Sequence, residues 1–262
     1  LVDLSGQVVR YQRRSKPFSL EDAYLQELGR LVESLIDGEC TGEKILGVGI
    51  SLPSIVDSEA GILRYSHILD LRDVPLSLLS RHIPFPCRFI NDANAAGFAE
   101  IYGTSAAGDL IYLSLSNSVG GAILTDGSLY MGGHLRAGEF GHNTLVPGGR
   151  KCYCGKEGCL DAYCSARLLS GQADGNLAAF FDGLREGDPA KQAVWREYLE
   201  YLAIAVNNLH MSFDCDVIVG GYVGAFLEEF GGPLRSLLEA RNTFLPDASY
   251  LKFCRYRLEG SA

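Results

Sequence analysis

The segment from Gly132 to Ser165 constrains this chain more than any other. It is rich in glycine, and it carries Glu139 and His142 toward three closely spaced cysteines. These cysteines, Cys152, Cys154 and Cys159, follow the pattern C-x-C-x4-C, and His142 precedes the first of them by nine intervening residues. Three sulfur donors and one imidazole can close a tetrahedron around Zn²⁺. The pattern therefore predicts a zinc site.

Such a site would have a structural role. Four protein ligands leave zinc no open coordination position, so the metal cannot generate a zinc-bound hydroxide. We expect it to tie the two ends of the loop together. The alternative is a disulfide or a group of buried free thiols, because cysteine often behaves as a small core residue.

Length and charge limit the possible functions. A chain of 262 residues can form one large domain or two lobes with a substantial core. Its net charge of −9 and its lack of a Lys/Arg cluster argue against nucleic-acid binding by this chain alone. No apolar run approaches the roughly 20 residues of a membrane helix, and the N-terminus has no secretory signal. We expect a cytoplasmic protein with no membrane partner.

The remaining cysteines and the chain ends add two further expectations. Residues 1–10 read as a strand, a turn and a strand without an initiator Met, which predicts a fragment with residues missing at both ends. Framework spacing is absent from the other five cysteines, which favours a reducing compartment. These five are Cys40, Cys87, Cys164, Cys215 and Cys254.

The first part of the chain alternates between helix and strand patterns. A capping box at Ser19 opens an amphipathic helix that Gly38 ends. Apolar strands are predicted over residues 45–52 and 88–92, and a helix over residues 93–102. This α/β alternation favours a sheet covered by helices.

The second part begins with hairpins. Strands are predicted over 110–116, 119–124 and 128–131, and Pro189 opens a long helix that runs to Leu209. A further strand over 216–219 leads into Gly220 and Gly221. We therefore predict an N-terminal α/β lobe over residues 1–103 and a larger C-terminal lobe over 104–254, with the tail 255–262 returning to the first lobe.

Polar residues follow the predicted strand at 88–92. Ligands of open α/β sheets gather at the carboxyl ends of strands, where Asn91 and Asp92 would lie. A carboxylate there can accept a hydroxyl proton or a hydrogen bond from a polar ligand. Alternatively, Asp92 and Asn94 cap the following helix.

Three other features are candidate ligand contacts. Glu139 lies near His142, which a metal would hold in place, so its carboxylate can accept hydrogen bonds from the hydroxyls of a polyol. Alternatively, it is simply a solvated surface carboxylate. The loop from Ser116 to Gly121 and the Gly220–Gly224 segment can offer backbone N–H groups to a nucleotide, although such loops are more often tight turns.

Four motifs together resemble the ROK family, which combines bacterial sugar kinases with sugar-responsive repressors. The motifs are Asn91-Asp92-Ala-Asn94-Ala-Ala96, Ala137-Gly-Glu139-Phe-Gly-His142, Cys152-x-Cys154-Gly-x-x-Gly158-Cys159-Leu160-Asp161 and Val217-Ile-Val-Gly220-Gly221. The resemblance spans almost the whole chain. It implies an α/β, two-lobed, actin/hexokinase-like (ribonuclease H-like) fold with a sugar between the lobes.

The resemblance also implies roles for individual residues. Asn91, Asp92, Glu139 and His142 look like hexose-hydroxyl contacts, and His142 with the three cysteines looks like the zinc site. Asp161 stands where the family usually has a sugar-binding Glu, so that contact is shortened by one methylene.

Kinases and repressors of this family differ in their phosphate loops. The kinase loop Asp-x-Gly-Gly-Thr does not occur in this sequence, and Ser116-Asn117-Ser118 replaces a Gly-Thr-Gly-type loop. The family's Pro-Gly after the early strand is Pro53-Ser54 here. Side chains in place of glycines restrict the approach of backbone to phosphates, and phosphoryl transfer depends on such positioning.

These departures favour a sugar-sensing transcriptional regulator. It would bind a hexose or N-acetylhexosamine, bind DNA through an N-terminal domain outside this chain, and form a homodimer or homotetramer. The alternative is an ATP-dependent sugar kinase, with Asp92 as general base and ATP/Mg²⁺ as cofactor. Gly120, Gly121, Gly220 and Gly221 would then contact the nucleotide.

Overall fold

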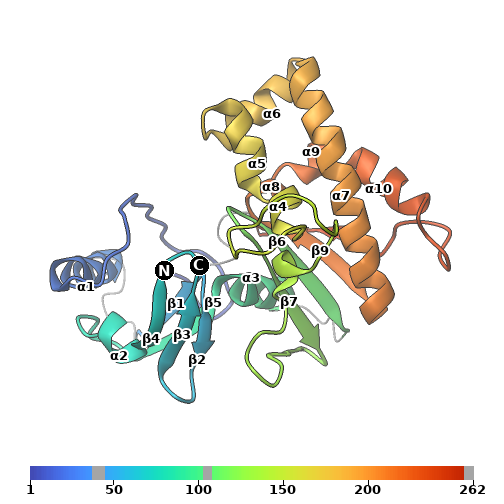
Figure 1. The fold of residues 1–262 in the computed structure, drawn as a ribbon. Helices are drawn as coiled ribbons and strands as arrows, with labels where there is room; N and C mark the ends of the chain where they lie inside the picture. Colours follow the sequence, from blue (N-terminus) through green and yellow to red (C-terminus); the bar gives the residue numbers. More distant parts are fainter. Residues whose placement is uncertain (37–44, 103–107, 257–262) are drawn as a thin grey trace. The chain divides into compact units, whose positions relative to one another are not determined.

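The computed structural model describes residues 1–36, 45–102 and 108–256 (Figure 1). The chain divides into two compact units. Leu1–Ala95 and Tyr102 belong to the first unit, and Ala96–Ile101 belongs to the second with the chain from Gly108 onward. The predicted boundary at residues 103 and 104 lies outside the described residues, as do residues 257–262 of the predicted tail.

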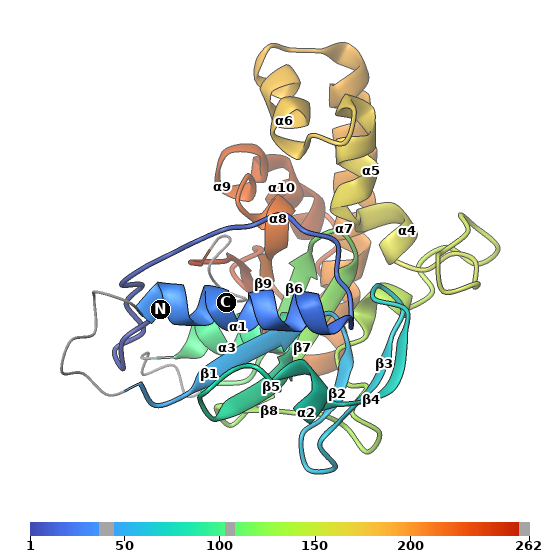
Figure 2. The same ribbon diagram turned by 90° about the vertical axis from the view of Figure 1, so that its left-hand side faces the viewer.

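The first unit contains two small sheets. Its elements are α1 (Asp22–Ile36), β1 (Val48–Leu52), β2 (Ile55–Asp57), β3 (Ile62–Ser66), β4 (Leu71–Pro75), α2 (Leu76–Leu79) and β5 (Cys87–Asn91). Strands β1 and β5 pair in parallel, with Leu52 opposite Asn91. Strands β2, β3 and β4 form an antiparallel meander. Helix α1 lies across β1 in Figure 2, and its Leu25 is buried in a core with Leu63 and Phe89.

Two expectations for this unit need correction, and one part of it was not expected. The paired strands expected at the N-terminus are reduced to one isolated bridge between Val2 and Val8. The strand predicted over 88–92 ends at Asn91, because Asp92 already begins the next helix. The β2–β4 meander was not predicted, since each strand is short and left-handed turn residues such as Asp70 interrupt the pattern.

A five-stranded mixed sheet organises the second unit. Its strands are β6 (Leu110–Leu115), β7 (Val119–Thr125), β8 (Ser128–Leu129), β9 (Asp216–Gly220) and β10 (Leu251–Phe253), in the order β10-β9-β6-β7-β8. Strand β6 is parallel to β9 and antiparallel to β7. Residues of β6 alternate between two buried clusters, one with Leu113 and one with Tyr112, so both faces of the sheet are covered.

Helices cover this sheet. They are α3 (Asp92–Ile101), α4 (Asp161–Cys164), α5 (Ala166–Ser170), α6 (Leu177–Arg185), α7 (Pro189–Phe213), α8 (Gly221–Gly224), α9 (Leu227–Phe230) and α10 (Gly232–Glu239), with 3₁₀ turns η1 (Phe140–His142) and η2 (Gly171–Ala173). The long helix α7 begins where predicted because Asp188 accepts hydrogen bonds from Ala190 N and Lys191 N, ahead of Pro189. The α/β expectation is confirmed.

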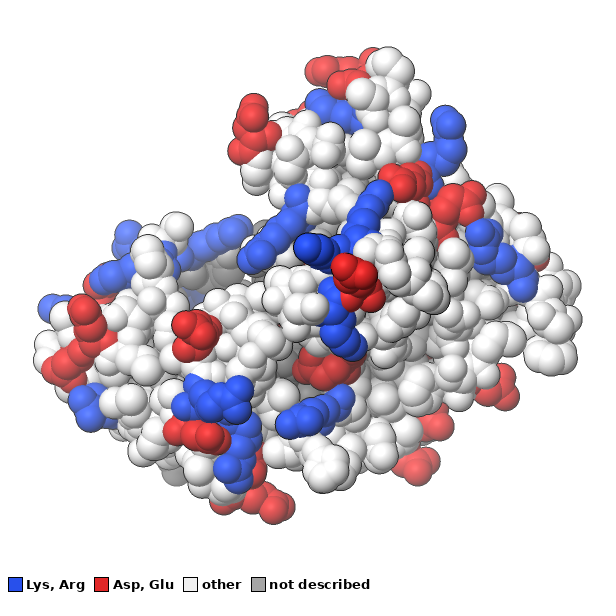
Figure 3. All heavy atoms as spheres, viewed as in Figure 1, with Lys and Arg blue, Asp and Glu red and all other residues white. Residues whose placement is uncertain are grey.

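The surface has no strong bias to one charge on the face that Figure 3 shows. Basic and acidic side chains are interspersed there. Within the described residues, no helix combines the length and apolar character needed to cross a membrane.

Candidate functional site

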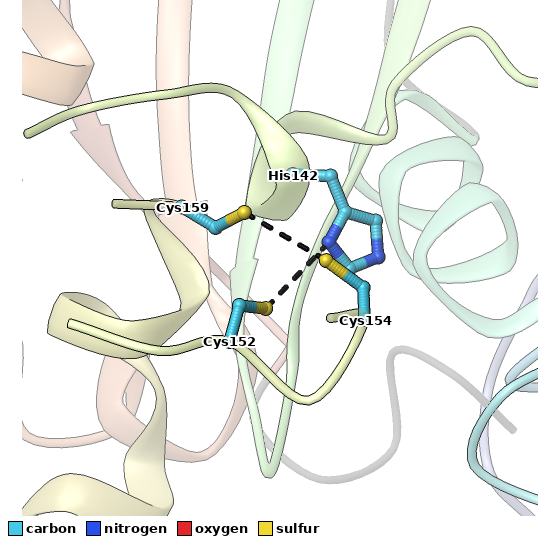
Figure 4. A group of neighbouring side chains, drawn as sticks. All are labelled: His142, Cys152, Cys154 and Cys159. Atoms are coloured by element: carbon cyan, nitrogen blue, oxygen red, sulfur yellow. Dashed lines mark hydrogen bonds between the residues drawn. The ribbon is translucent and has the colours of Figure 1, made fainter. Parts of the chain in front are cut away.

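The predicted cysteine and histidine ligands lie together in the second unit (Figure 4). The ligand atoms of His142, Cys152, Cys154 and Cys159 are all within 4.8 Å of one another. Cys152 and Cys159 are buried, and the other two are half-buried. All seven cysteines among the described residues are free, so the disulfide alternative does not hold for them.

The loop's backbone brings these residues together. Cys152 N donates to Lys156 O over 2.8 Å, and Gly155 N donates to Cys152 O over 3.0 Å, which folds the segment into a tight knuckle. Gly158 has a φ of +79°, and a β-carbon there would collide with Val146 O. Glycine is therefore required at position 158, immediately before the ligand Cys159.

The donor geometry fits a tetrahedral ion. The Sγ atoms of Cys154 and Cys159 are 3.8 Å apart, and Cys152 Sγ is 3.9 Å from His142 Nδ1. With Zn–S bonds of about 2.3 Å and a Zn–N bond of about 2.0 Å, a tetrahedron needs S–S separations of about 3.8 Å and S–N separations of about 3.5 Å. All donor pairs lie within 4.8 Å of one another, so these four residues can hold a metal after small movements of their side chains.

Burial governs the protonation of the thiols. It raises the pKa of Cys152 to about 12 and also raises the pKa of Cys159. Burial opposes ionisation of Cys154 too, but hydrogen bonds from Lys156 N and from the neighbouring thiols lower its pKa. A divalent cation would supply the positive charge that converts all three thiols to thiolates.

The second ring nitrogen of His142 faces a tyrosine that sequence reasoning missed. Tyr153 OH lies 3.4 Å from His142 Nε2, and the two rings meet edge to face at 5.4 Å. Partial burial raises the pKa of Tyr153, and the charges of Asp161 and Glu139 raise it further. Tyr153 therefore shares one electrostatic environment with His142, Asp161 and Glu139. Its position between two ligand cysteines was the signal that could have identified it.

Asp161 lies at the first turn of α4, directly after the metal loop, the segment from His142 to Cys159 that contains the four predicted ligands. Its side chain is buried, with 5% exposed, and Oδ2 accepts a 2.6 Å hydrogen bond from Val119 N. Burial raises the pKa of Asp161, and the bond from Val119 partly offsets that shift. The carboxylate thus contacts the start of β7.

Glu139 is exposed at the start of η1, where its carbonyl accepts a bond from His142 N. It lines an open pocket of about 410 Å³ between the η1 segment and the C-terminal half of α7. Arg136, Asn143, Asn208 and Phe213 line the same pocket. Glu139 therefore directly precedes the 3₁₀ turn that carries His142.

Asn91 and Asp92 lie in the first unit, where β5 meets α3. The helix cap is made by Asn91, whose Oδ1 accepts from Asn94 N over 3.0 Å, and not by Asp92 or Asn94 as the alternative interpretation required. Asp92 Oδ1 accepts a hydrogen bond from the adjacent Ala93 N over 2.9 Å. Burial raises the pKa of Asp92.

The glycines proposed for nucleotide contact have packing roles. A β-carbon on Gly121 would collide with the ring of Phe140, and Gly120 precedes it in β7. A β-carbon on Gly220 would collide with Tyr112, and Gly221 has a φ of +76° close to Leu115 and Ser116. These close approaches account for Gly121, Gly220 and Gly221 without a nucleotide.

Comparison with known proteins decides the family. A family model described as the ROK family matches residues 1–248. The chain belongs to the ROK family. Proteins similar to this chain include both sugar kinases and transcriptional repressors. The N-acetylmannosamine kinase of Escherichia fergusonii is 30% identical over an alignment of 232 residues, which covers 86% of this chain and 78% of the kinase.

The DNA-binding transcriptional repressor Mlc of Escherichia coli is 31% identical over 197 residues. That match covers 72% of this chain and 48% of the repressor, so the chain spans about half of that protein. A crystal structure of a ROK glucokinase from Streptomyces griseus, in complex with glucose and AMPPNP, superposes with a TM-score of 0.70 at 25% identity. It covers 91% of this chain and 81% of the glucokinase.

Proposed function

We propose that this chain is the sugar-binding effector domain of a ROK-family transcriptional regulator of carbohydrate metabolism. Its ligand is a hexose, an N-acetylhexosamine or a derivative. The residues proposed to bind sugar hydroxyls are Asn91, Asp92, Glu139, His142 and Asp161. The donor set of His142 and the three cysteines supports a structural Zn²⁺, because thiolates and imidazole are the ligands that zinc prefers.

The turn between β6 and β7 is the observation that favours a regulator over a kinase. Phosphate-binding turns offer free backbone N–H groups to the anion. Here the Val119 N–H is already bonded to the Asp161 carboxylate. At the other end of the turn, the carbonyl of Ser116 accepts a bond from Ala166 N over 2.8 Å, which ties the turn to the start of α5. A buried carboxylate at this turn competes with a phosphate for the same donor and repels its charge.

The side chains of the turn support the same proposal. Ser116 and Ser118 stand where the family's kinases have glycines, and Ser116 Oγ lies 3.3 Å from Ser114 Oγ. Their β-carbons restrict how closely a nucleotide could approach the backbone. Of the residues proposed to bind sugar hydroxyls, Asp161 contacts this turn, and the other four lie outside it.

The regulator proposal includes three features of the whole protein. DNA binding would belong to a separate N-terminal domain, and the match to the DNA-binding repressor Mlc, which covers 48% of that protein, is compatible with this. We propose a homodimer or homotetramer in the cytoplasm. Binding of sugar would then change the geometry of that assembly.

The second candidate function is ATP-dependent phosphorylation of a sugar. It is favoured by the N-acetylmannosamine kinase relative, which matches 86% of this chain. Asp92 would be the general base, since burial raises its pKa toward the range in which a carboxylate accepts a proton efficiently. Mg²⁺ and ATP would be required, with Gly120, Gly121, Gly220 and Gly221 near the nucleotide.

Two measurements on the full-length protein separate the candidates. Calorimetric titrations with D-glucose, D-mannose and N-acetyl-D-mannosamine test sugar binding, and ADP release with the same sugars tests turnover. Binding with no turnover supports the regulator. Turnover of about 1 to 100 per second that is lost in Asp92→Asn supports the kinase instead.

An exposed carboxylate provides the control for that assay. Asp73→Asn changes a side chain of the same unit that is 61% exposed, so it should affect neither binding nor turnover. If none of the sugars binds the wild-type protein, both candidates are wrong.

A further inference from the structure

Ser54 lies at the same sheet edge as Asn91 and Asp92. Strands β1 and β5 run in parallel with Leu52 opposite Asn91, so the residues that follow both strands emerge at one edge. The carboxyl edge of parallel strands is where ligands of α/β proteins bind. Asn91 Nδ2 donates to Ser54 O over 3.2 Å, which directly joins the two strand ends.

The backbone of Ser54 is fully engaged, but its hydroxyl is not. Ser54 N donates to Leu52 O over 2.8 Å, and its carbonyl accepts from Asn91. The residue is only 5% exposed, and its Oγ has no hydrogen-bond partner among the described residues.

A second buried serine of this unit shows what a structural hydroxyl does. Ser66 is 2% exposed, and its Oγ donates to Pro53 O over 2.6 Å and accepts from Leu69 N over 3.1 Å. Both hydrogen-bonding functions of that hydroxyl are therefore used within the protein. The contrast indicates that the Ser54 hydroxyl is not held in place by an internal bond.

An unsatisfied buried hydroxyl is unfavourable for a folded protein. Burial removes its bonds to water, and native proteins satisfy the large majority of such groups. A glycine or alanine would fill this position without that cost, and glycine is the family's usual residue after the proline. A ligand hydroxyl would supply the missing partner.

We propose that Ser54 is a specificity-determining contact that exchanges a hydrogen bond with one hydroxyl of the bound sugar, beside Asn91 and Asp92. This inference rests on the proposed sugar binding and holds for either candidate function. The β-carbon and hydroxyl of Ser54 also occupy space that glycine leaves open. A sugar with a bulky substituent at the contacted carbon is therefore excluded.

Calorimetric titration of Ser54→Ala tests the contact. The probes are D-glucose, D-mannose, N-acetyl-D-mannosamine and N-acetyl-D-glucosamine. We expect Ser54→Ala to weaken the best-bound probe by about 3- to 10-fold, the effect of one neutral hydrogen bond. The Tm of the unliganded protein should be unchanged or higher, because the variant lacks the unsatisfied oxygen.

Ser80→Ala is the matched control. Ser80 is half-buried in the same unit, and its Oγ donates to Leu76 O over 3.3 Å. Its loss should lower the Tm slightly and leave the sugar Kd unchanged. Ser54→Gly should lose the same hydrogen bond as Ser54→Ala and additionally admit larger substituents.

Monodeoxy analogues of the best-bound probe identify the contacted hydroxyl. One analogue should bind the wild type and Ser54→Ala with equal affinity, while the others keep the 3- to 10-fold difference. An unchanged Kd for every probe in Ser54→Ala, or a lower Tm of that variant without a change in Kd, overturns the inference and leaves the proposed function standing. If the wild type binds no probe, the proposed function itself is wrong.

Discussion

Asp161 Oδ2 accepts a 2.6 Å hydrogen bond from the backbone N–H of Val119, 42 residues earlier in the chain. Asp161 lies two residues after the metal-loop residue Cys159, and Val119 begins β7. The bond therefore joins the exit of the metal loop to the turn between β6 and β7. Asp161 is only 5% exposed, so its carboxylate loses most of its hydration in the fold. The hydrogen bond from Val119 N compensates for part of that loss.

Asp161→Ala should destabilise the protein by about 2 kcal/mol, because it leaves the buried Val119 N–H without an acceptor. Asp161→Asn keeps an oxygen acceptor for Val119 N, so its loss of unfolding free energy should be less than half of that of Asp161→Ala. Urea unfolding monitored by circular dichroism measures both values. Asp182→Ala, which changes a side chain that is 62% exposed, is the control and should remain within about 0.5 kcal/mol of wild type. Equal stability of Asp161→Ala and wild type would contradict this role for the bond.

Removal of metal should lower the Tm by about 8 °C or more, because an ion that binds only the folded loop stabilises it by mass action. The purified protein should contain about one zinc per chain by atomic emission. Cys159→Ala should lose the ion. Cys164→Ala removes an equally buried thiol outside the cluster and should retain the ion. Full zinc content in Cys159→Ala would exclude the proposed ligand set.

The sequence predicted elements whose pattern is continuous. The β6–β7 hairpin and the helix from Pro189 were found because long apolar periodicity and a helix-opening proline are local signals. The metal cluster was also predictable, since its four donors lie within an 18-residue stretch. A loop this short brings its ligands together by itself.

Contacts between distant segments could not be predicted in the same way. The bond from Val119 to Asp161 and the orphaned hydroxyl of Ser54 depend on how strands and loops pack, which no local spacing encodes. The cap of α3 was assigned to Asp92 or Asn94 in one interpretation, but Asn91 makes it. A shift of one residue at a helix start moves the capping role to a neighbour that is equally suitable.

Tyr153→Phe should retain zinc but bind it several-fold more weakly. When Nδ1 of His142 binds metal, the proton lies on Nε2, which faces Tyr153 OH at 3.4 Å. Partners of this kind orient a ligand histidine, and their loss usually weakens binding by about 10-fold or more. The smaller effect follows from the long distance and from the 45% exposure of Tyr153. Competition with a zinc chelator measures the change, with Tyr130→Phe as an exposed control, and unchanged zinc affinity would contradict an orienting role.

Asp92→Asn should raise the Tm at pH 7 by about 1 to 3 °C. Burial raises the pKa of Asp92 in the folded state above its unfolded value, so folding favours the neutral carboxyl. That favourable contribution is complete below the unfolded pKa of about 3.9 and is lost as the pH rises through the folded pKa. Asparagine resembles the neutral carboxyl at every pH. The difference in Tm between Asp92→Asn and wild type should therefore shrink toward zero below about pH 4.

Asp57→Asn provides a control of opposite sign in the same unit. Hydrogen bonds from Ala60 N and Arg64 lower the pKa of Asp57, so its ionised form stabilises the fold above its unfolded pKa. Asp57→Asn should lower the Tm at pH 7, and that loss should also fade on acidification. Thermal melts of both variants from pH 3.5 to 8 measure the two trends. A fall in Tm for Asp92→Asn at pH 7 would mean that the fold uses the ionised carboxylate, and burial would then not be the dominant influence on Asp92.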